Sequence, residues 1–284
     1  MPDRAVRKRP HVIPLRDNLP TDRFPVITLL IVAINVAVFL FLQHPSFSGE
    51  QVKTTTVVDY GAIPYRVTHP DKNCELARTR DQFGNRGETV VCEGTSEFRA
   101  ARDSGAIVKV KEAPAYLTLF TSMFMHGGWL HIFFNMLFLW IFGNNVEDAM
   151  GPVRFIAFYL LGGLAATALQ LVMGPNSATP NLGASGAIAA VLGGYIVMYP
   201  RARVVTLVFI IFLFTILELP AIFFLGIWFA EQLFFGALTT ANTVAGGGVA
   251  YWAHVGGFVA GLLLIRIFAT RRSTAADGPR FPVY

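Results

Sequence analysis

The sequence predicts an all-α polytopic membrane protein with six transmembrane helices. A small extramembrane insertion of mixed or β-containing structure is predicted between the first two. Hydrophobic residues make up 54% of the 284 residues. Charged residues make up only 14%, against roughly 25% in soluble domains. Several apolar runs approach the roughly 20 residues that a helix needs to cross a bilayer. Together these observations predict a chain embedded in lipid.

The net charge of +5 does not indicate a nucleic-acid-binding protein. The basic residues concentrate in the N-terminal tail, in the insertion and in short turns between apolar runs. That distribution is typical of charges that orient a membrane protein. We therefore expect the lipid bilayer, and no nucleic acid, as a partner.

The basic N-terminal tail, residues 1–23, is followed by the first apolar run. This run is long for the core of a signal peptide, and no small-residue cleavage pattern follows it. We therefore expect a retained first helix, with its N-terminus in the cytoplasm. The six predicted spans are 24–43, 129–147, 153–173, 183–199, 220–238 and 250–268.

The arginines of the short loops favour one orientation. They lie in the turns after the second, fourth and sixth spans, whereas the two short loops predicted outside carry no charge. This agrees with the positive-inside rule and predicts two cytoplasmic tails, in a bacterial cytoplasmic membrane. The arginines are Arg154, Arg201, Arg203, Arg271 and Arg272, the uncharged loops are 174–182 and 239–249, and the C-terminal tail is 271–284.

Two further apolar stretches are too short to span. Residues 204–217 would reach about 21 Å as a helix, against a hydrocarbon core of roughly 30 Å. Glu218 and Pro220 then interrupt the pattern, so we expect 204–219 to be an interfacial or re-entrant segment. Residues 115–125 are expected to lie along or partly in the outer leaflet.

The segment 44–113 has a different composition, with ten basic and ten acidic residues. It includes strand-like runs at 53–58 and 106–110 and both cysteines, Cys74 and Cys92. A loop of this length can be translocated regardless of its charge. Outside the cytoplasm a disulfide is permitted, and we expect a small extracytoplasmic domain closed by a Cys74–Cys92 bridge.

Ser185 lies between Gly183 and Gly186 at the head of the fourth predicted span. An unpaired hydroxyl in an apolar medium costs on the order of 2–7 kcal/mol. We therefore expect Ser185 to have a local partner or to line a water-filled cavity that opens outward.

His254 lies near the start of the sixth span and so in the same leaflet as Ser185. Gly257 and Gly261 give this span a G-x-x-x-G face, which allows close packing against the small residues of the fourth span. Such packing would bring Ser185 and His254 within hydrogen-bond reach, as the activation of a serine nucleophile requires.

His131 and Asn135 lie four residues apart in the second span, about 40° apart around a helix. An imidazole and an amide on one face are suitable donors for a developing oxyanion. His126 lies just before this span. With His131 it could instead ligate a metal, but no third ligand presents itself in the outer leaflet, so we expect no metal.

Acidic partners for His254 are scarce. Glu231 is the one carboxylate in mid-span, where an ionisable residue is a functional candidate. It could orient His254, or it could be protonated or bonded to a neighbouring helix. We expect a Ser–His dyad without a third member.

Four motifs resemble the rhomboid family of intramembrane serine proteases. They are His126-x4-His131-x3-Asn135, Gly143-x3-Glu147-x3-Gly151, Gly183-x-Ser185-Gly186 and Ala253-His254-x-Gly256-Gly257-x3-Gly261. The resemblance covers about 115–270 and implies a rhomboid catalytic core, residues 114–270, that holds transmembrane helices 2 to 6.

The resemblance implies a role for each motif residue. Ser185 would be the nucleophile and His254 the general base. His131, Asn135 and the Ser185 backbone N–H would form the oxyanion hole. Glu147 would be a structural carboxylate that ties helices together near the cytoplasmic face.

We expect a serine endopeptidase that needs no cofactor and cleaves single-span membrane proteins near the outer face. The alternative is a catalytically silent, rhomboid-like protein that binds membrane helices. A transporter is a third reading, disfavoured because the chain lacks two-fold repeat character. The oligomeric state and the role of the insertion are not predicted.

Overall fold

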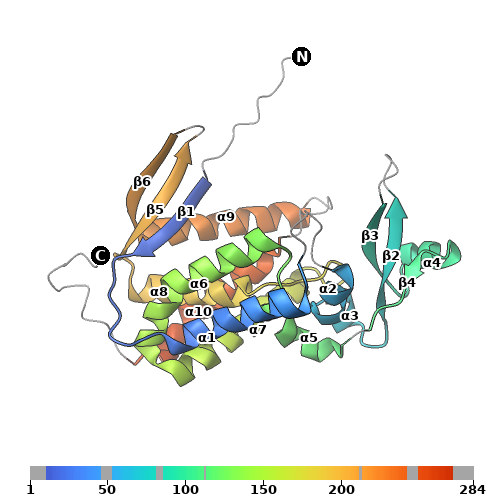
Figure 1. The fold of residues 1–284 in the computed structure, drawn as a ribbon, viewed down its shortest axis with the longest axis horizontal. Helices are drawn as coiled ribbons and strands as arrows, with labels where there is room; N and C mark the ends of the chain where they lie inside the picture. The colour runs from blue at the N-terminus through green and yellow to red at the C-terminus, as the bar shows by residue number, and fades with distance from the viewer. Residues whose placement is uncertain are drawn as a thin grey trace, which may run out of the picture.

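The computed structural model describes residues 11–45, 53–80, 86–111, 113–210, 213–241 and 249–270. The C-terminal tail, 271–284, and the first ten residues of the N-terminal tail lie outside these ranges, as do Arg271 and Arg272. The described chain is mostly helical. Its helices form a bundle with a small β-sheet at one end and the insertion at the other (Figure 1).

The bundle consists of long apolar helices with short connections. In the described part of the chain, α6, α7, α9 and α10 are long and apolar enough to cross a membrane. The helix formed by α1 and η1 is shorter, and α8 has 14 residues. The bounds are α1 Val26–Ala37, η1 Val38–Leu42, α6 Trp129–Met150, α7 Pro152–Met173, α8 Ser185–Met198, α9 Ala221–Ala241 and α10 Tyr251–Phe268.

Helix α8 lies at the centre of the bundle and is buried along most of its length. Its small residues let neighbouring backbones touch. A Cβ atom at Gly257 of α10 would collide with the carbonyl oxygen of Gly186, and one at Gly261 would collide with that of Ala190. The close α8–α10 contact therefore requires glycine on α10, as expected for small-residue packing in membranes.

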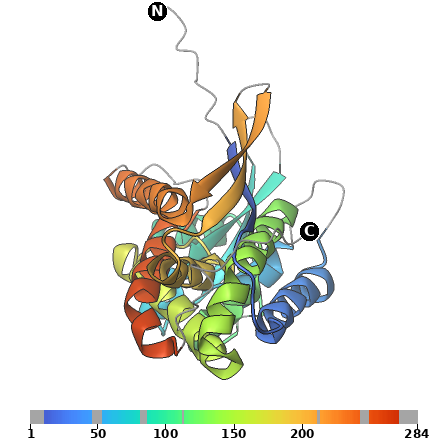
Figure 2. The same ribbon diagram turned by 90° about the vertical axis from the view of Figure 1, so that its left-hand side faces the viewer.

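Residues 203–220 form a β-hairpin, which the all-α prediction did not include. Strand β5 (Arg203–Ile210) pairs antiparallel with β6 (Leu213–Pro220), and β1 (His11–Asp17) adds to the free edge of β5. Valine, isoleucine, threonine and phenylalanine dominate these strands, and such residues favour extended backbone. The sheet rises from the bundle beside α9 (Figure 2).

The insertion has its own small core, formed by Val58, Ile63 and Leu76 around a disulfide between Cys74 and Cys92 with an S–S distance of 2.04 Å. The strand expected at 53–58 is wrong, because most of that run forms helix α2. Val58 of this helix is buried by tertiary packing, which overrides its β-propensity. The elements are α2 Thr54–Tyr60, α3 Pro64–Thr68, β2 Cys74–Arg80, β3 Arg86–Cys92, α4 Ser96–Asp103 and β4 Ile107–Val108.

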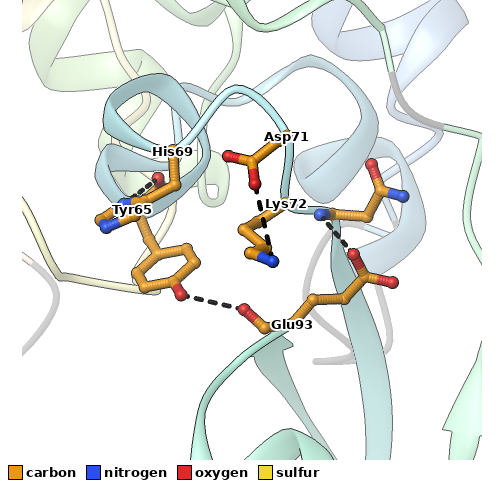
Figure 3. Close-up of polar contacts among 6 residues, drawn as sticks. Tyr65, His69, Asp71, Lys72 and Glu93 are labelled. Carbon is orange, nitrogen blue, oxygen red and sulfur yellow. Dashed lines mark hydrogen bonds and ion pairs between the residues drawn. The ribbon is translucent and has the colours of Figure 1, made fainter.

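Polar contacts fasten α3 to the turn after β3 (Figure 3). The Tyr65 hydroxyl donates to the Glu93 carbonyl oxygen at 2.9 Å, and the Asn73 backbone N–H donates to the Glu93 carboxylate at 3.1 Å. The His69 ring stacks on Tyr65 with centroids 4.2 Å apart. These contacts join the helical and sheet parts of the insertion.

The insertion also contacts the loop between α7 and α8. Ala62 and Asn181 exchange two backbone hydrogen bonds, at 3.0 and 2.8 Å. Nearby, the Ser177 carbonyl oxygen accepts from the Tyr65 backbone N–H at 3.0 Å. The short helices α5 (Ala115–Thr121) and η2 (Ser122–Phe124) follow the insertion. The insertion is therefore bonded to the loop that leads into Ser185.

Candidate active site

Ser185 and His254 lie at the end of the bundle next to the insertion. Ser185 is the first residue of α8, and His254 lies in the first turn of α10. The Ser185 hydroxyl oxygen is 2.8 Å from Nε2 of His254. The glycines of α10 allow this distance because they let the two backbones touch. A hydroxyl at hydrogen-bond distance from an imidazole is the geometry that general-base activation of a serine requires.

His131 lies beside Ser185, in the first turn of α6. A Cβ atom at Gly183 would be 2.9 Å from Nε2 of His131 and 3.5 Å from the Ser185 hydroxyl oxygen. Gly183 has a φ of +124°, a conformation that other residues rarely adopt. Only glycine fits at this position, on grounds of both space and backbone conformation.

The tautomer of His131 follows from its partner. The Gly127 backbone N–H donates to Nδ1 of His131 at 3.1 Å. Because a backbone N–H can only donate, Nδ1 is an acceptor and the proton of the neutral ring is on Nε2. That N–H lies next to Gly183 and Ser185, where an oxyanion would need a donor.

Asn135 lies one turn after His131 and is buried. Its amide nitrogen donates to the His131 carbonyl oxygen at 2.8 Å. An amide group carries two N–H donors, so one remains for another acceptor. The structure thus places the two candidate oxyanion donors on one face of α6.

Small residues of α7, η2 and the loop before α8 surround a cavity beside Ser185. The cavity has room for about one water molecule. Its polar lining comes from Ser122, Asn181 and Thr167 together with Ser185. A site of this size and polarity suits a single water molecule next to the serine.

A comparison with protein families matches residues 113–271, which is more than half of the chain, to the Rhomboid domain. The chain belongs to the rhomboid family. It is a multi-pass membrane protein, consistent with the apolar helices described above.

Curated relatives of this rhomboid include mitochondrial and bacterial proteins. The chain is 29% identical over 152 residues to "Rhomboid protein 1, mitochondrial" of Saccharomyces cerevisiae, covering 52% of this chain and 40% of that protein. It is 30% identical over 186 residues to "RHOMBOID-like protein 1" of Arabidopsis thaliana, covering 62% and 40%. It is 40% identical over 75 residues to "Rhomboid protease GluP" of Bacillus subtilis, covering 26% and 14%. The matches therefore span 40% or less of these relatives.

His126 of this rhomboid is fully buried beside His131, with ring centroids 5.2 Å apart. Gln43, at the end of the first helix, holds its backbone from both sides. The Gln43 amide nitrogen donates to the His126 carbonyl oxygen at 2.7 Å, and the His126 N–H donates to the Gln43 amide oxygen at 2.8 Å. The first helix thereby fixes the segment that leads to His131.

Glu147 of α6 caps the first helix at the far end of the bundle. Its carboxylate accepts the backbone N–H groups of Ile27 and Thr28 at 2.9 and 2.7 Å, and the Thr28 hydroxyl at 2.7 Å. Pro25, at the N-cap position of α1, makes no side-chain capping hydrogen bond of its own. A buried carboxylate there satisfies free N–H groups and is stabilised by the helix dipole.

His254 has a second partner besides Ser185, and the sequence did not predict it. The amide oxygen of Gln232, in α9, lies 2.7 Å from Nδ1 of His254. Glu231, the carboxylate considered in its place, is exposed. A helix turns about 100° per residue, so consecutive residues point in different directions. An uncharged amide in an apolar run carries no signal that would have identified it from sequence.

Proposed function

We propose that this rhomboid is an intramembrane serine endopeptidase. The observation that carries the proposal is the 2.8 Å distance between the Ser185 hydroxyl oxygen and Nε2 of His254. The match to the Rhomboid domain and relatives with the word protease in their names support the same reading.

The proposed reaction begins when the Ser185 hydroxyl oxygen attacks a scissile carbonyl carbon. His254 takes the hydroxyl proton at Nε2 and then gives it to the leaving amine as the C–N bond breaks. A water molecule attacks the resulting acyl-enzyme while His254 takes its proton. His254 then returns that proton to the Ser185 oxygen as the ester C–O bond breaks, which releases a carboxylic acid and free Ser185. The cavity beside Ser185 offers a place for that water.

Negative charge on the carbonyl oxygen would be stabilised by three donors. They are the Nε2–H of His131, the free amide N–H of Asn135 and the backbone N–H of Ser185. The last belongs to the first turn of α8, whose N–H groups have no partner within the helix. Each fixed donor of this kind contributes about 2.7–4 kcal/mol to transition-state stabilisation in a well-studied case.

The proposed substrates are single-span membrane proteins with a locally unwound stretch near the outer face. Carbonyl groups in a regular helix are already hydrogen-bonded, so a strand-like segment with small residues is the better target. No cofactor enters the proposed reaction.

The proposed topology has six spans, including α1 with η1 and the short α8, and cytoplasmic tails in a bacterial cytoplasmic membrane. Arginines at the sheet end of the bundle, and a disulfide at the other end, support it. These arginines are Arg16, Arg23, Arg154, Arg201 and Arg203.

The test is cleavage of a tagged single-span protein in proteoliposomes, with the product ends mapped by mass spectrometry. We expect a cut near the outer face that is absent with Ser185→Ala. Binding of the substrate without any cleavage, equal for both proteins, would instead indicate the catalytically silent helix-binding protein.

A further inference from the structure

The His254 imidazole is held from two sides. Nε2 faces Ser185 on α8 at 2.8 Å, and Nδ1 faces the amide oxygen of Gln232 on α9 at 2.7 Å. An amide oxygen can only accept, so Nδ1 must carry the proton in this arrangement. The lone pair of the neutral ring is then on Nε2, the atom that must take the serine proton.

Two residues of α9 shape this contact. Gln232 is 6% exposed, whereas Glu231 and Leu233 on either side are exposed. Trp228 lies one turn earlier on the same face of α9, with its ring centroid 5.7 Å from that of His254. The indole limits the positions that the imidazole can take, and the amide sets its rotation.

The chemistry of the residue type matters in an apolar surrounding. A carboxylate at this position would have to be buried beside the imidazole in the bundle, at a high desolvation cost. A neutral amide accepts the Nδ1 proton without that cost. It therefore fixes the tautomer of His254 without adding charge, unlike the aspartate of a serine protease triad.

We propose that Gln232 is a positioning residue that holds His254 in the tautomer with its proton on Nδ1, so that Nε2 is free to accept the Ser185 proton. The role rests on the proposed protease function, but the tautomer itself does not. Gln232 bonds to the ring nitrogen on the other side of the imidazole from Ser185, so it acts through His254.

The first test measures the tautomer without any need for activity. Imidazole ¹⁵N resonances, recorded on protein labelled with ¹⁵N-histidine, distinguish a protonated from an unprotonated Nδ1. We expect a protonated Nδ1 for His254 in the natural protein and a mixture of tautomers in Gln232→Leu. A natural protein with an unprotonated Nδ1 at His254 would overturn the proposal, whether or not the protein is a protease.

The second test measures the rate of labelling by a fluorophosphonate probe, with kinact and KI determined separately from pH 5 to pH 9. Gln232→Leu should lower kinact about 10- to 100-fold, because general-base catalysis contributes roughly 10²–10⁴-fold and is only partly lost. KI should change less than about two-fold, since Gln232 does not contact the probe.

Gln232→Glu is a second variant that keeps the size of the side chain, so its effect on labelling does not come from altered packing. Its carboxylate is buried at a desolvation cost that pairing with the imidazolium offsets, so the acid limb of the kinact profile should move to higher pH. The other groups facing His254 are Ser185 on α8, Trp228 on α9 and the titratable His131 on α6, and all are unchanged in this variant.

Glu231→Gln is the matched control, since it changes the neighbouring exposed residue and should leave kinact and its pH profile unaltered. Natural kinact in Gln232→Leu, or an unmoved acid limb in Gln232→Glu, would contradict the positioning role. If the probe labels Ser185→Ala as well as the natural protein, the proposed protease function is refuted instead.

Discussion

The hydroxyl group of Tyr195, in α8, donates a 2.6 Å hydrogen bond to the carboxylate of Asp17, in β1, 178 positions away in the sequence. The same carboxylate oxygen accepts from the Asn145 side chain of α6 at 2.7 Å. The N-terminal strand is thereby joined to the two helices that begin, at the opposite end of the bundle, at Ser185 and next to His131.

Burial raises the pKa of Asp17 from 3.8 to about 6, and the hydrogen bond from Tyr195 only partly offsets this. Because the folded-state pKa is the higher one, the protonated form favours folding. That stabilisation is complete below about pH 4 and is lost as the pH rises through about 6, in total roughly 3 kcal/mol.

Asp17→Asn should remove this pH dependence. The asparagine oxygen can accept both hydrogen bonds, so thermal unfolding midpoints from pH 4 to pH 8 should fall less with pH than those of the natural protein. Above pH 6 the variant should be the more stable. Asp71→Asn, at an exposed residue of the insertion, is the control. Parallel pH curves for Asp17→Asn and the natural protein would argue against this role of Asp17.

Gly183→Ala should abolish most activity. The added Cβ would lie 2.9 Å from the His131 ring and would force a residue other than glycine to a φ of +124°. We expect fluorophosphonate labelling to slow by at least about 10-fold, because the imidazole of His131 is displaced from its place beside Ser185. Gly105→Ala is the matched control, since Gly105 also has a positive φ but faces open space. Equal labelling by both variants would show that His131 tolerates the displacement.

Glu147→Gln should destabilise the fold. An amide cannot accept all three hydrogen bonds from Ile27 and Thr28, and one buried N–H would face an amide N–H instead. A loss of about 1–3 kcal/mol is expected, seen as a lower midpoint of thermal unfolding. Labelling of Ser185 at low temperature should be retained, because Glu147 lies at the opposite end of the bundle. An unchanged midpoint would indicate that α1 does not depend on this cap.

Replacement of Cys74 and Cys92 by serine should loosen the insertion. The bridge closes a loop with a sequence separation of 18, for which chain entropy suggests a stabilisation of about 3 kcal/mol. We expect limited proteolysis to cut within 53–111 sooner in the double variant, and a reducing agent to have the same effect on the natural protein alone. Identical digestion of both proteins, with and without reductant, would rule this contribution out.

Most of the site could be predicted from the sequence, because its residues are unusual within apolar runs. A serine between glycines, and a histidine two residues before a Gly-Gly pair, stand out in apolar runs. The glycines also predict which helices approach closely, and this fixes which leaflet the polar groups share. Nothing comparable indicates Gln232, since its role depends on how α9 is rotated against α10.

The three-stranded sheet could not be predicted from the sequence, for a different reason. Strand β1 pairs with β5, so that His11 lies opposite Phe209 and Asp17 opposite Val204. Pairing across so many residues leaves no local pattern, and β5 alone resembles any short apolar run. The run at 53–58 was misread as a strand because valine favours strands, whereas the burial of Val58 in the core of the insertion is compatible with helix α2.

If Ser185 is a nucleophile that His254 activates, a reagent that reacts with such serines should modify Ser185 and no other residue. The purified protein in detergent is treated with a fluorophosphonate probe, and the modified peptide is identified by mass spectrometry. We expect one modified residue, Ser185, with labelling lost in Ser185→Ala and in His254→Ala but kept in Ser104→Ala. Labelling that continues in Ser185→Ala, or that is equally fast in His254→Ala, would contradict it.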